Sequence, residues 1–308
     1  MFSIFLLSSA ICSAQAVHAE QVKLLASIKP IQLIAEDMLG DLAEVDVLLP
    51  PGSSPHHFSL KPSSIGLIHD ADLFIWGGPG LELFLTKTVS QLERPALALL
   101  EGGDAHHHDE EHAADNEPSH TDEALGAEAD DQHDHGDSDP HFWMAPDRAL
   151  AAADLIKDRL VERYPTDAAL YEQAYNDFAA RLSVTDQQLQ QQLKVVGNTG
   201  FYVFHDAFGS FVEHYQLHQL GYFTVDPGRK PGARRLSEIR TALENDQARC
   251  VFVEPQFKAP VVDSLIRGLD IRVGRLDPLA VAIEAGPGGY SNYLQSLADS
   301  FTNCLSAE

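Results

Sequence analysis

Short apolar runs alternate with amphipathic stretches through the first hundred residues. The run at 22–27 is followed by a stretch from Ile31 to Met38 in which apolar positions repeat at the spacing of one helix face. Further apolar runs at 44–49 and 73–76 each end in a turn rich in proline or glycine. A strand followed by a helix, repeated along the chain, predicts a mainly parallel sheet covered by helices.

The same alternation returns in the last third of the chain. Four apolar segments there predict strands, at residues 200–204, 220–225, 249–253 and 271–276. We therefore expect an α/β protein with two (β/α) lobes, each built on a mainly parallel sheet, and a metal site in the cleft between them.

A long helical pattern separates the two regions of alternation, in two parts at 149–162 and 167–193. Along the second part, apolar residues recur mostly four apart, at Leu170, Ala174, Phe178, Leu182, Leu189 and Leu193. At 1.5 Å per residue this helix would extend about 40 Å, which is the span of a lobe or more. We expect it to be a long, rigid connector between the lobes.

The domain boundaries follow from these patterns and from the length of 308 residues. Single cores stop growing at about 250 to 300 residues, so two lobes are expected. We place a signal peptide at 1–19, an N-terminal lobe at 20–145, the helical connector at 146–195 and a C-terminal lobe at 196–308.

Charge is concentrated in one segment, residues 101–139, which holds fifteen acidic residues, seven histidines and no Lys or Arg. With hardly any large apolar side chain the segment cannot pack a core, and it is predicted to be a surface loop of the N-terminal lobe. The whole chain has a formal net charge of -25, which would repel nucleic acid and anionic lipid and would favour cations.

The first nineteen residues contain an apolar run and then small residues ending at Ala19, as in a secretory signal, although no Lys or Arg precedes the run. Export would place the mature protein in an oxidising compartment. The two cysteines that remain, Cys250 and Cys304, are then expected to form a disulfide; the alternative is that each is a buried small apolar residue.

Three histidines outside the acidic segment, His56, His141 and His205, each follow a predicted strand or precede a predicted helix, and Asp277 lies at another strand end. Ligands bind beside the carboxyl ends of parallel strands, so these side chains could converge there. Imidazole nitrogens suit the tetrahedral shell of zinc, with Asp277 or water in the fourth position. Spacing alone leaves open the alternative that each histidine has a purely structural role.

The segments that carry these histidines resemble the metal-binding motifs of the cluster A-I periplasmic binding proteins of ABC importers, and most closely those of the zinc-binding members. Besides the three histidine motifs, the resemblance includes residues 223–225, 231–233, 253–257 and 276–279, and it covers nearly all of the mature sequence. It implies that His56, His141 and His205 are metal ligands. Manganese-binding relatives typically have Glu in place of His205, so a histidine there indicates zinc.

The resemblance leaves the fourth ligand open. Some zinc-binding members have a Glu directly before the first histidine, whereas this chain has Pro55. Asp277 is then the best candidate, with water as the alternative. We expect His57 to be a residue beside the site rather than a ligand, because neighbouring side chains of an extended segment point to opposite faces.

The acidic segment also has a counterpart in zinc-binding members of that family. Its histidines are predicted to bind zinc weakly; they are His106, His107, His108, His112, His120, His133 and His135. The alternative is a solvated charged insertion without a specific role.

By resemblance, the protein is expected to capture Zn²⁺ in the periplasm and to deliver it to the membrane permease of an ABC importer. Three alternatives stay open: a manganese- or iron-binding protein of the same fold, a periplasmic zinc buffer without a transporter, and an enzyme that uses an open three-histidine site. The sequence has no HExxH pair that would favour the enzyme.

Overall fold

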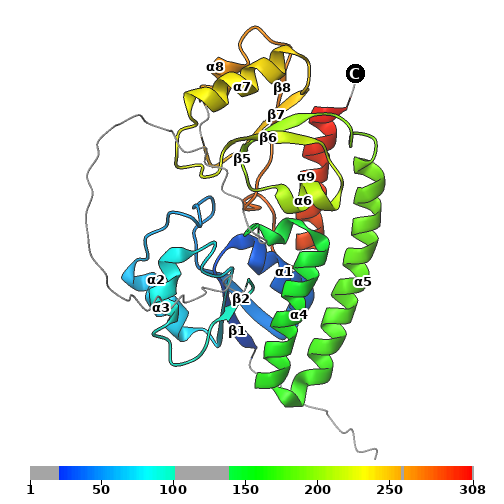
Figure 1. Cartoon of the computed structure of the whole chain (residues 1–308). Coiled ribbons are helices and arrows are strands. Elements are labelled where there is room, and N and C mark those ends of the chain that lie inside the picture. The colour runs from blue at the N-terminus through cyan, green and yellow to red at the C-terminus, as the bar shows by residue number, and fades with distance from the viewer. Residues whose placement is uncertain (1–20, 101–138, 258–259, 307–308) are drawn as a thin grey trace, which may run out of the picture.

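Two parallel sheets, each at the centre of one lobe, organise the computed structural model, which describes residues 21–100, 139–257 and 260–306 (Figure 1). The predicted signal peptide and the seven histidines of the acidic segment lie outside these described residues.

The N-terminal sheet has four parallel strands in the order β2-β1-β3-β4. Its strands are β1 (Val22–Ala26), β2 (Ala43–Val47), β3 (Leu73–Trp76) and β4 (Leu97–Ala98). The helices of this part of the chain are α1 (Lys29–Leu39), α2 (Pro62–Asp70) and α3 (Thr86–Val89), with two short 3₁₀ turns, η1 (Gly40–Leu42) and η2 (Leu83–Leu85). All four residues of β3 are buried, as expected for a parallel strand covered on both faces.

The C-terminal sheet repeats this plan, with four parallel strands in the order β6-β5-β7-β8. Its strands are β5 (Phe201–His205), β6 (Gln219–Thr224), β7 (Cys250–Val253) and β8 (Arg272–Arg275). Its helices are α6 (Gly209–His214), α7 (Ala233–Glu244) and α8 (Pro260–Leu265). The candidate ligands lie at the carboxyl end of a strand, as His205 does, or on segments that follow a strand, as His56 and His141 do.

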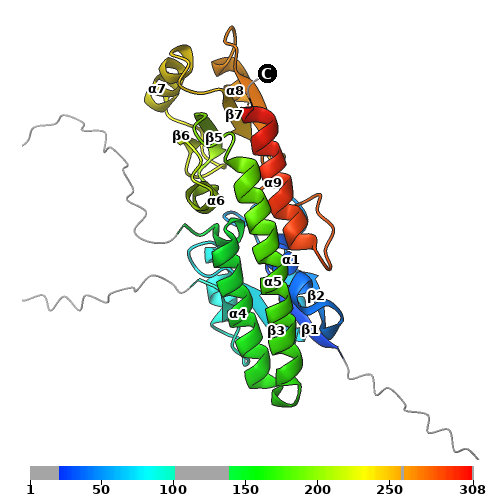
Figure 2. The same ribbon diagram turned by 90° about the vertical axis from the view of Figure 1, so that its right-hand side faces the viewer.

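Three long helices flank the junction of the lobes: α4 (Pro146–Arg163), α5 (Ala168–Leu193) and α9 (Gly289–Leu305). The turn η4 (Pro165–Asp167) separates α4 from α5, and η3 (Phe142–Met144) precedes α4. In Figure 2, α5 runs from beside the N-terminal sheet to beside the C-terminal sheet, with α9 packed along its upper part. Helix α5 also contacts α1, so one helix packs against elements of both lobes.

The apolar core is continuous between the lobes. One cluster joins residues of β1 and β3, such as Leu24 and Ile75, to Leu189 of α5 and to Phe201 of β5 and Phe301 of α9. A second, smaller cluster lies on the other face of the C-terminal sheet, under α7 and α8. Because packed cores deform little, this continuity makes the junction of the lobes stiff.

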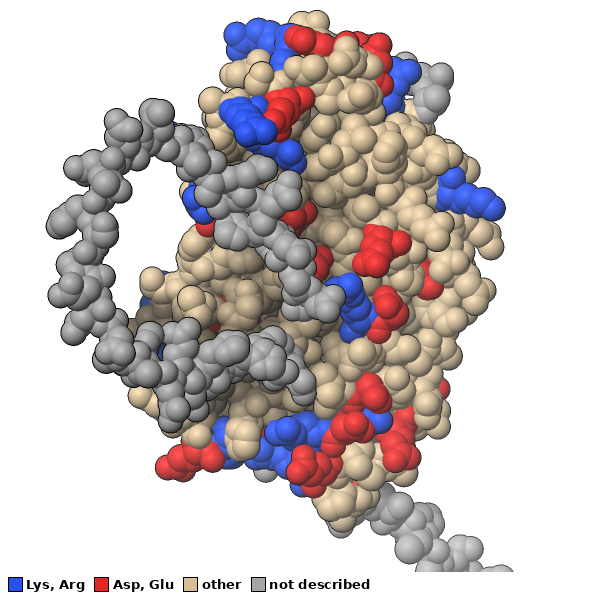
Figure 3. Space-filling model, viewed as in Figure 1, with Lys and Arg blue, Asp and Glu red and all other residues tan. Residues whose placement is uncertain are grey.

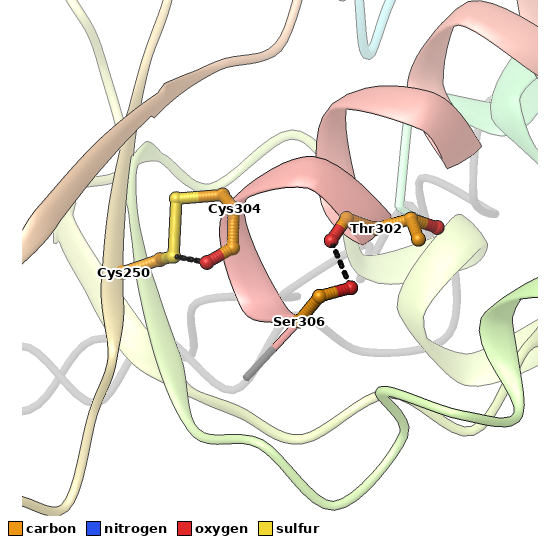
Figure 4. Close-up of a disulfide and its surroundings, with 4 residues drawn as sticks. All are labelled: Cys250, Thr302, Cys304 and Ser306. Atoms are coloured by element: carbon orange, nitrogen blue, oxygen red, sulfur yellow. Dashed lines mark hydrogen bonds between the residues drawn. A yellow bond between two sulfur atoms is a disulfide. The ribbon is translucent and has the colours of Figure 1, made fainter. Parts of the chain in front are cut away.

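A disulfide links Cys250 of β7 to Cys304 of α9, which confirms the predicted pairing (Figure 4). Their Cα atoms lie 6.1 Å apart, and both residues are buried. The bridge therefore fastens the last helix to a central strand of the C-terminal sheet.

The predicted elements agree with the structure in type, with boundaries shifted by up to three residues, but one strand was missed. Strand β4 has only two residues, too few for an alternation pattern to be visible. The predicted stripe on α5 was wrong at Leu170, which is 53% exposed, because Tyr171 faces the core instead.

Charged side chains of both signs are interspersed over the face of the molecule seen in Figure 3. About a third of the acidic residues, fifteen of forty-six, belong to the segment at 101–139. The described helices include none long and apolar enough to span a membrane.

Candidate metal centre

Three histidines come together where the lobes meet. His56 lies on the loop between β2 and α2, His141 directly precedes η3, and His205 is the last residue of β5. One ring nitrogen from each lies within 4.8 Å of the others, and among the described residues these three form the only such group of potential metal ligands. Three segments separated by 85 residues, from His56 to His141, and by 64 residues, from His141 to His205, thus supply one cluster of imidazoles.

The spacing of the rings fits a small metal ion. Nε2 of His56 lies 3.2 Å from Nε2 of His141. Two nitrogens bound tetrahedrally at 2.0 to 2.1 Å would be about 3.3 Å apart. The three pairs of ring centroids are 5.1 to 5.4 Å apart, and each pair is arranged edge to face, so the rings surround a point rather than stack.

Asp139 orients His141. Its Oδ1 accepts hydrogen bonds from Nδ1, at 2.9 Å, and from the backbone N–H of His141, at 3.0 Å. With the proton on Nδ1, the lone pair of Nε2 points to the other histidines, which is the tautomer that binds a metal. Burial raises the pKa of the Asp139 carboxyl, but hydrogen bonds and charge from His141 outweigh burial and lower it, so the carboxylate stays ionised.

The same carboxylate connects the two lobes. Oδ2 of Asp139 accepts a hydrogen bond of 3.0 Å from the backbone N–H of Ser210, in the first turn of α6, and the Ser210 hydroxyl donates to the carbonyl of His141 at 2.9 Å. A side chain at Gly209 would place its Cβ 3.2 Å from Oδ2 of Asp139, so glycine allows this close approach.

Glu254 lies beside His205, as Asp139 lies beside His141. His205 is the last residue of β5, and Glu254 directly follows the neighbouring strand β7, so the two residues lie at the same edge of the sheet. Both residues are buried. Nδ1 of His205 lies 3.3 Å from Oε1 of Glu254, an ion-pair distance without hydrogen-bond geometry. Nε2 of His205 is buried and has no hydrogen-bond partner among the described residues, which leaves its lone pair free for a metal.

Trp143 packs against one of the candidate ligands. Its ring packs edge-on against His141, with the centroids 5.4 Å apart. Its indole N–H donates to the carbonyl of Pro278 at 2.7 Å, and its own carbonyl accepts a hydrogen bond from the hydroxyl of Tyr290 at 2.7 Å. The segment that carries His141 is therefore fixed to the C-terminal lobe and to α9.

His56 is neutral at physiological pH. Burial lowers the pKa of its imidazole to about 3, with smaller contributions from His141 and His205. A neutral imidazole is the form that binds metal ions. The space between the three rings is small, about 10 Å³, which is room for one ion or water.

Asp277, predicted as a possible fourth ligand, is not part of this group of ligand atoms. Its carboxylate accepts hydrogen bonds from the backbone N–H groups of Leu279, at 3.0 Å, and Val281, at 2.7 Å, and from the side-chain amide of Gln256. Its oxygens are thus engaged in shaping their own loop.

His57 lies at the edge of the site, with its ring turned to Asp226 of the C-terminal lobe. Neither Asp139 nor Asp226 was singled out by the sequence pattern. Asp139 had a local signal, because an acidic residue two positions before a ligand histidine is within reach of its Nδ1. Asp226 had none, because only the fold brings it to residue 57.

Two parallel α/β lobes fixed together by long helices, with three histidines converging at their junction, define a two-lobed metal-binding protein. The model of the family described as zinc-uptake complex component A, periplasmic, matches residues 24–304. The chain belongs to this family of periplasmic zinc-uptake components, which is not a class of enzymes.

Its relatives agree with this assignment. The high-affinity zinc uptake system protein ZnuA of Yersinia pestis is 36% identical over 320 residues, covering 97% of this chain and 96% of the relative. The protein of the same name from Haemophilus ducreyi is 35% identical over 303 residues, covering 91% and 92%. A crystal structure of a zinc-bound deletion mutant of ZnuA has a TM-score of 0.73 at 26% identity, and the match covers 94% of this chain and all of that one.

Proposed function

We propose that this protein captures Zn²⁺ in the periplasm through His56, His141 and His205 and delivers it to the membrane permease of an ABC importer. The observation that carries the proposal is the convergence of one ring nitrogen from each histidine within 4.8 Å. Carboxylates beside the outer nitrogens of His141 and His205 add support, because they orient a metal-binding ring and raise its basicity.

Zinc suits these donors better than manganese does. Imidazole nitrogen is a borderline ligand that zinc accepts in a tetrahedral shell, whereas manganese prefers several oxygen ligands. The carboxylates of Asp139 and Glu254 face the outer nitrogens of the rings, so the donors that converge are nitrogens.

An enzyme with an organic substrate is disfavoured by the size of the site. A space of about 10 Å³, lined by the three histidines and by residues such as Pro55, Pro227 and Leu279, has room for one ion or water but for no larger molecule. The substrate is then the metal ion itself.

Competition between metals tests the choice of zinc. Metal-stripped protein is titrated with Zn²⁺ and with Mn²⁺ against a chelator of known affinity. We expect one tight zinc site that a tenfold excess of Mn²⁺ does not displace, and we expect His141→Ala to lose it. Preferential binding of Mn²⁺ would overturn the proposal.

The fourth ligand is a separate question, and the hydrogen bonds of Asp277 favour water. Asp277→Asn keeps the size of the side chain and removes its charge. If water completes the shell, zinc affinity changes by about threefold or less, the effect of one remote charge. A loss of a hundredfold or more would make Asp277 the ligand.

Delivery of zinc to a permease distinguishes the hypothesis of an importer component from that of a zinc buffer. The importer hypothesis expects that zinc-loaded protein stimulates ATP hydrolysis by the partner permease and ATPase in proteoliposomes, and that His141→Ala protein does not. Absence of stimulation with zinc-loaded protein would favour the buffer.

A further inference from the structure

A polar contact crosses from lobe to lobe at the edge of the metal centre. Nε2 of His57 lies 3.0 Å from Oδ1 and 2.9 Å from Oδ2 of Asp226, so the ring N–H is shared between both carboxylate oxygens. His57 is next in sequence to the candidate ligand His56, and 169 positions separate the two partners of the contact.

Hydrogen bonds within its own loop fix the position of Asp226. The backbone N–H of Gly228 donates to its Oδ1 at 2.8 Å. The hydroxyl of Thr224, the last residue of β6, donates to the carbonyl of Asp226 at 2.7 Å, so the loop is fixed to the end of a strand. The carboxylate therefore meets His57 without having to be ordered first.

The loop that carries His56 and His57 is anchored on either side of the two histidines, by backbone hydrogen bonds at its start and by Phe58 and Leu60, which pack against the apolar core. Leu48 and Leu49 donate backbone hydrogen bonds to the end of β1, at 2.8 and 3.0 Å, and α2 begins at Pro62. Between these points the loop has no helix or strand, and His56 is half-buried whereas His141 and His205 are buried. Of the three histidines, His56 has the position that depends most on loop contacts.

The two loops also fit closely. A Cβ atom at Gly228 would lie 3.2 Å from Cδ2 and 3.3 Å from Nε2 of His57, so only glycine lets the imidazole ring approach without a shift. Pro55 and Pro227, one from each loop, both line the space among the three histidines. The contact thus closes one side of the metal centre.

We propose that His57 and Asp226 form a latch between the lobes, which holds the loop of His56 in place and so lengthens the residence time of the bound metal. The pair acts as a positioning device and supplies no ligand. This inference rests on the proposed function, because it needs a metal held by His56.

The size of the effect is limited by exposure. The side chain of His57 is 59% exposed and that of Asp226 is 23% exposed, and exposed ion pairs stabilise proteins little. We therefore expect little change in thermal stability when the latch is removed, and an increase of about threefold to fivefold in the zinc dissociation rate.

The test measures zinc dissociation by stopped flow, with a chelating dye in excess, for the full chain and for His57→Ala, Asp226→Ala and the double variant. Each single change should speed dissociation, and the double change should add nothing more, since either single change already breaks the latch. His57→Gln, whose amide can still donate to Asp226, should restore part of the residence time. His69→Ala is the matched control, because His69 is an exposed histidine on α2.

Gly228→Ala gives an independent test, because it keeps both side chains of the latch but places a Cβ atom 3.2 Å from Oδ1 of Asp226 and 3.2 Å from Cδ2 of His57, so that one or both must shift by a few tenths of an ångström. It should speed dissociation as well. An unchanged zinc dissociation rate in either single variant would overturn the latch. So would a double variant in which the increase in rate equals the product of the two single increases. Neither result would affect zinc binding itself. Failure of the unaltered protein to bind zinc tightly would overturn the proposed function. This result does not depend on any of the latch variants.

Discussion

At the scale of single residues, the proposed metal centre depends on which ring nitrogen of each imidazole carries the proton. Asp139 fixes the proton of His141 on Nδ1, and Glu254 lies beside Nδ1 of His205. Nε2 of His141 then faces Nε2 of His56. In the proposed zinc site the histidines would supply the donors, and Asp139 would decide which nitrogen of His141 donates.

Replacing Asp139 tests this division of roles. Asp139→Asn should weaken zinc binding by about 10-fold to 100-fold, the usual effect of removing a carboxylate that orients a metal-binding histidine. Asp70→Asn, at an exposed position on α2, is the control and should bind zinc normally. Affinities are measured by chelator competition, and equal affinities of the two variants would contradict the role of Asp139.

The lowered pKa of His56 predicts an acid dependence of stability in the metal-free protein. In the unfolded chain this imidazole takes up a proton near pH 6.5, but in the folded protein only near pH 3. Its contribution to stability is therefore present above pH 6.5 and is lost progressively as the pH falls toward 3. Urea unfolding at pH 7.5, 6 and 5 should show a smaller acid-induced loss of stability in His56→Gln than in the unaltered protein. Parallel losses in the two proteins would exclude this contribution.

At the scale of elements, the long helix illustrates where pattern and structure agree. The spacing of apolar residues predicted a helix at 167–193, and α5 spans Ala168–Leu193. The predicted stripe began at Leu170 because it followed a spacing of four, but Tyr171 lies seven residues before Phe178, almost two full turns, and is therefore closer to the buried face. The helices α1, α4 and α9 pack against α5.

Two leucines of α5 make a matched pair for a stability test. Leu189 is completely buried, whereas Leu170 is 53% exposed. Leu189→Ala should lower the free energy of unfolding by about 2 to 5 kcal/mol, because it leaves a cavity in the core. Leu170→Ala should change it by about 0.5 kcal/mol or less, as is usual at the surface. Similar losses in the two variants, measured by urea unfolding, would contradict the orientation of the helix.

At the scale of the whole molecule, the junction of the lobes is built to resist opening. Helices α5 and α9 pack along it, and one apolar core runs through it. Asp139 and Trp143 add polar contacts from the His141 segment to the C-terminal lobe. A wide hinge motion would have to break this packing, so metal binding and release are expected to use small movements of loops.

Solution scattering tests the stiffness of the junction. Zinc binding should change the radius of gyration by less than about 1 Å, because packed cores move as rigid bodies. The metal-free and zinc-loaded proteins are compared at the same concentration, and zinc-loaded His141→Ala controls for nonspecific effects of the ion. A contraction of several ångströms on zinc binding would show that the lobes close by a hinge.

The sequence by itself determined the elements and the kind of donor. Periodicity is a local property, so strands such as 73–76 and the long helix are visible without any tertiary contact, and the histidines of the proposed site can offer a metal only ring nitrogens. The tertiary structure alone decided which groups meet: it brought His56 to His141 and His205, engaged Asp277 in its own loop, and paired Asp226 with His57. The physical reason is that a metal centre between two lobes depends on the relative placement of segments distant in the chain, and packing rather than local pattern fixes that placement.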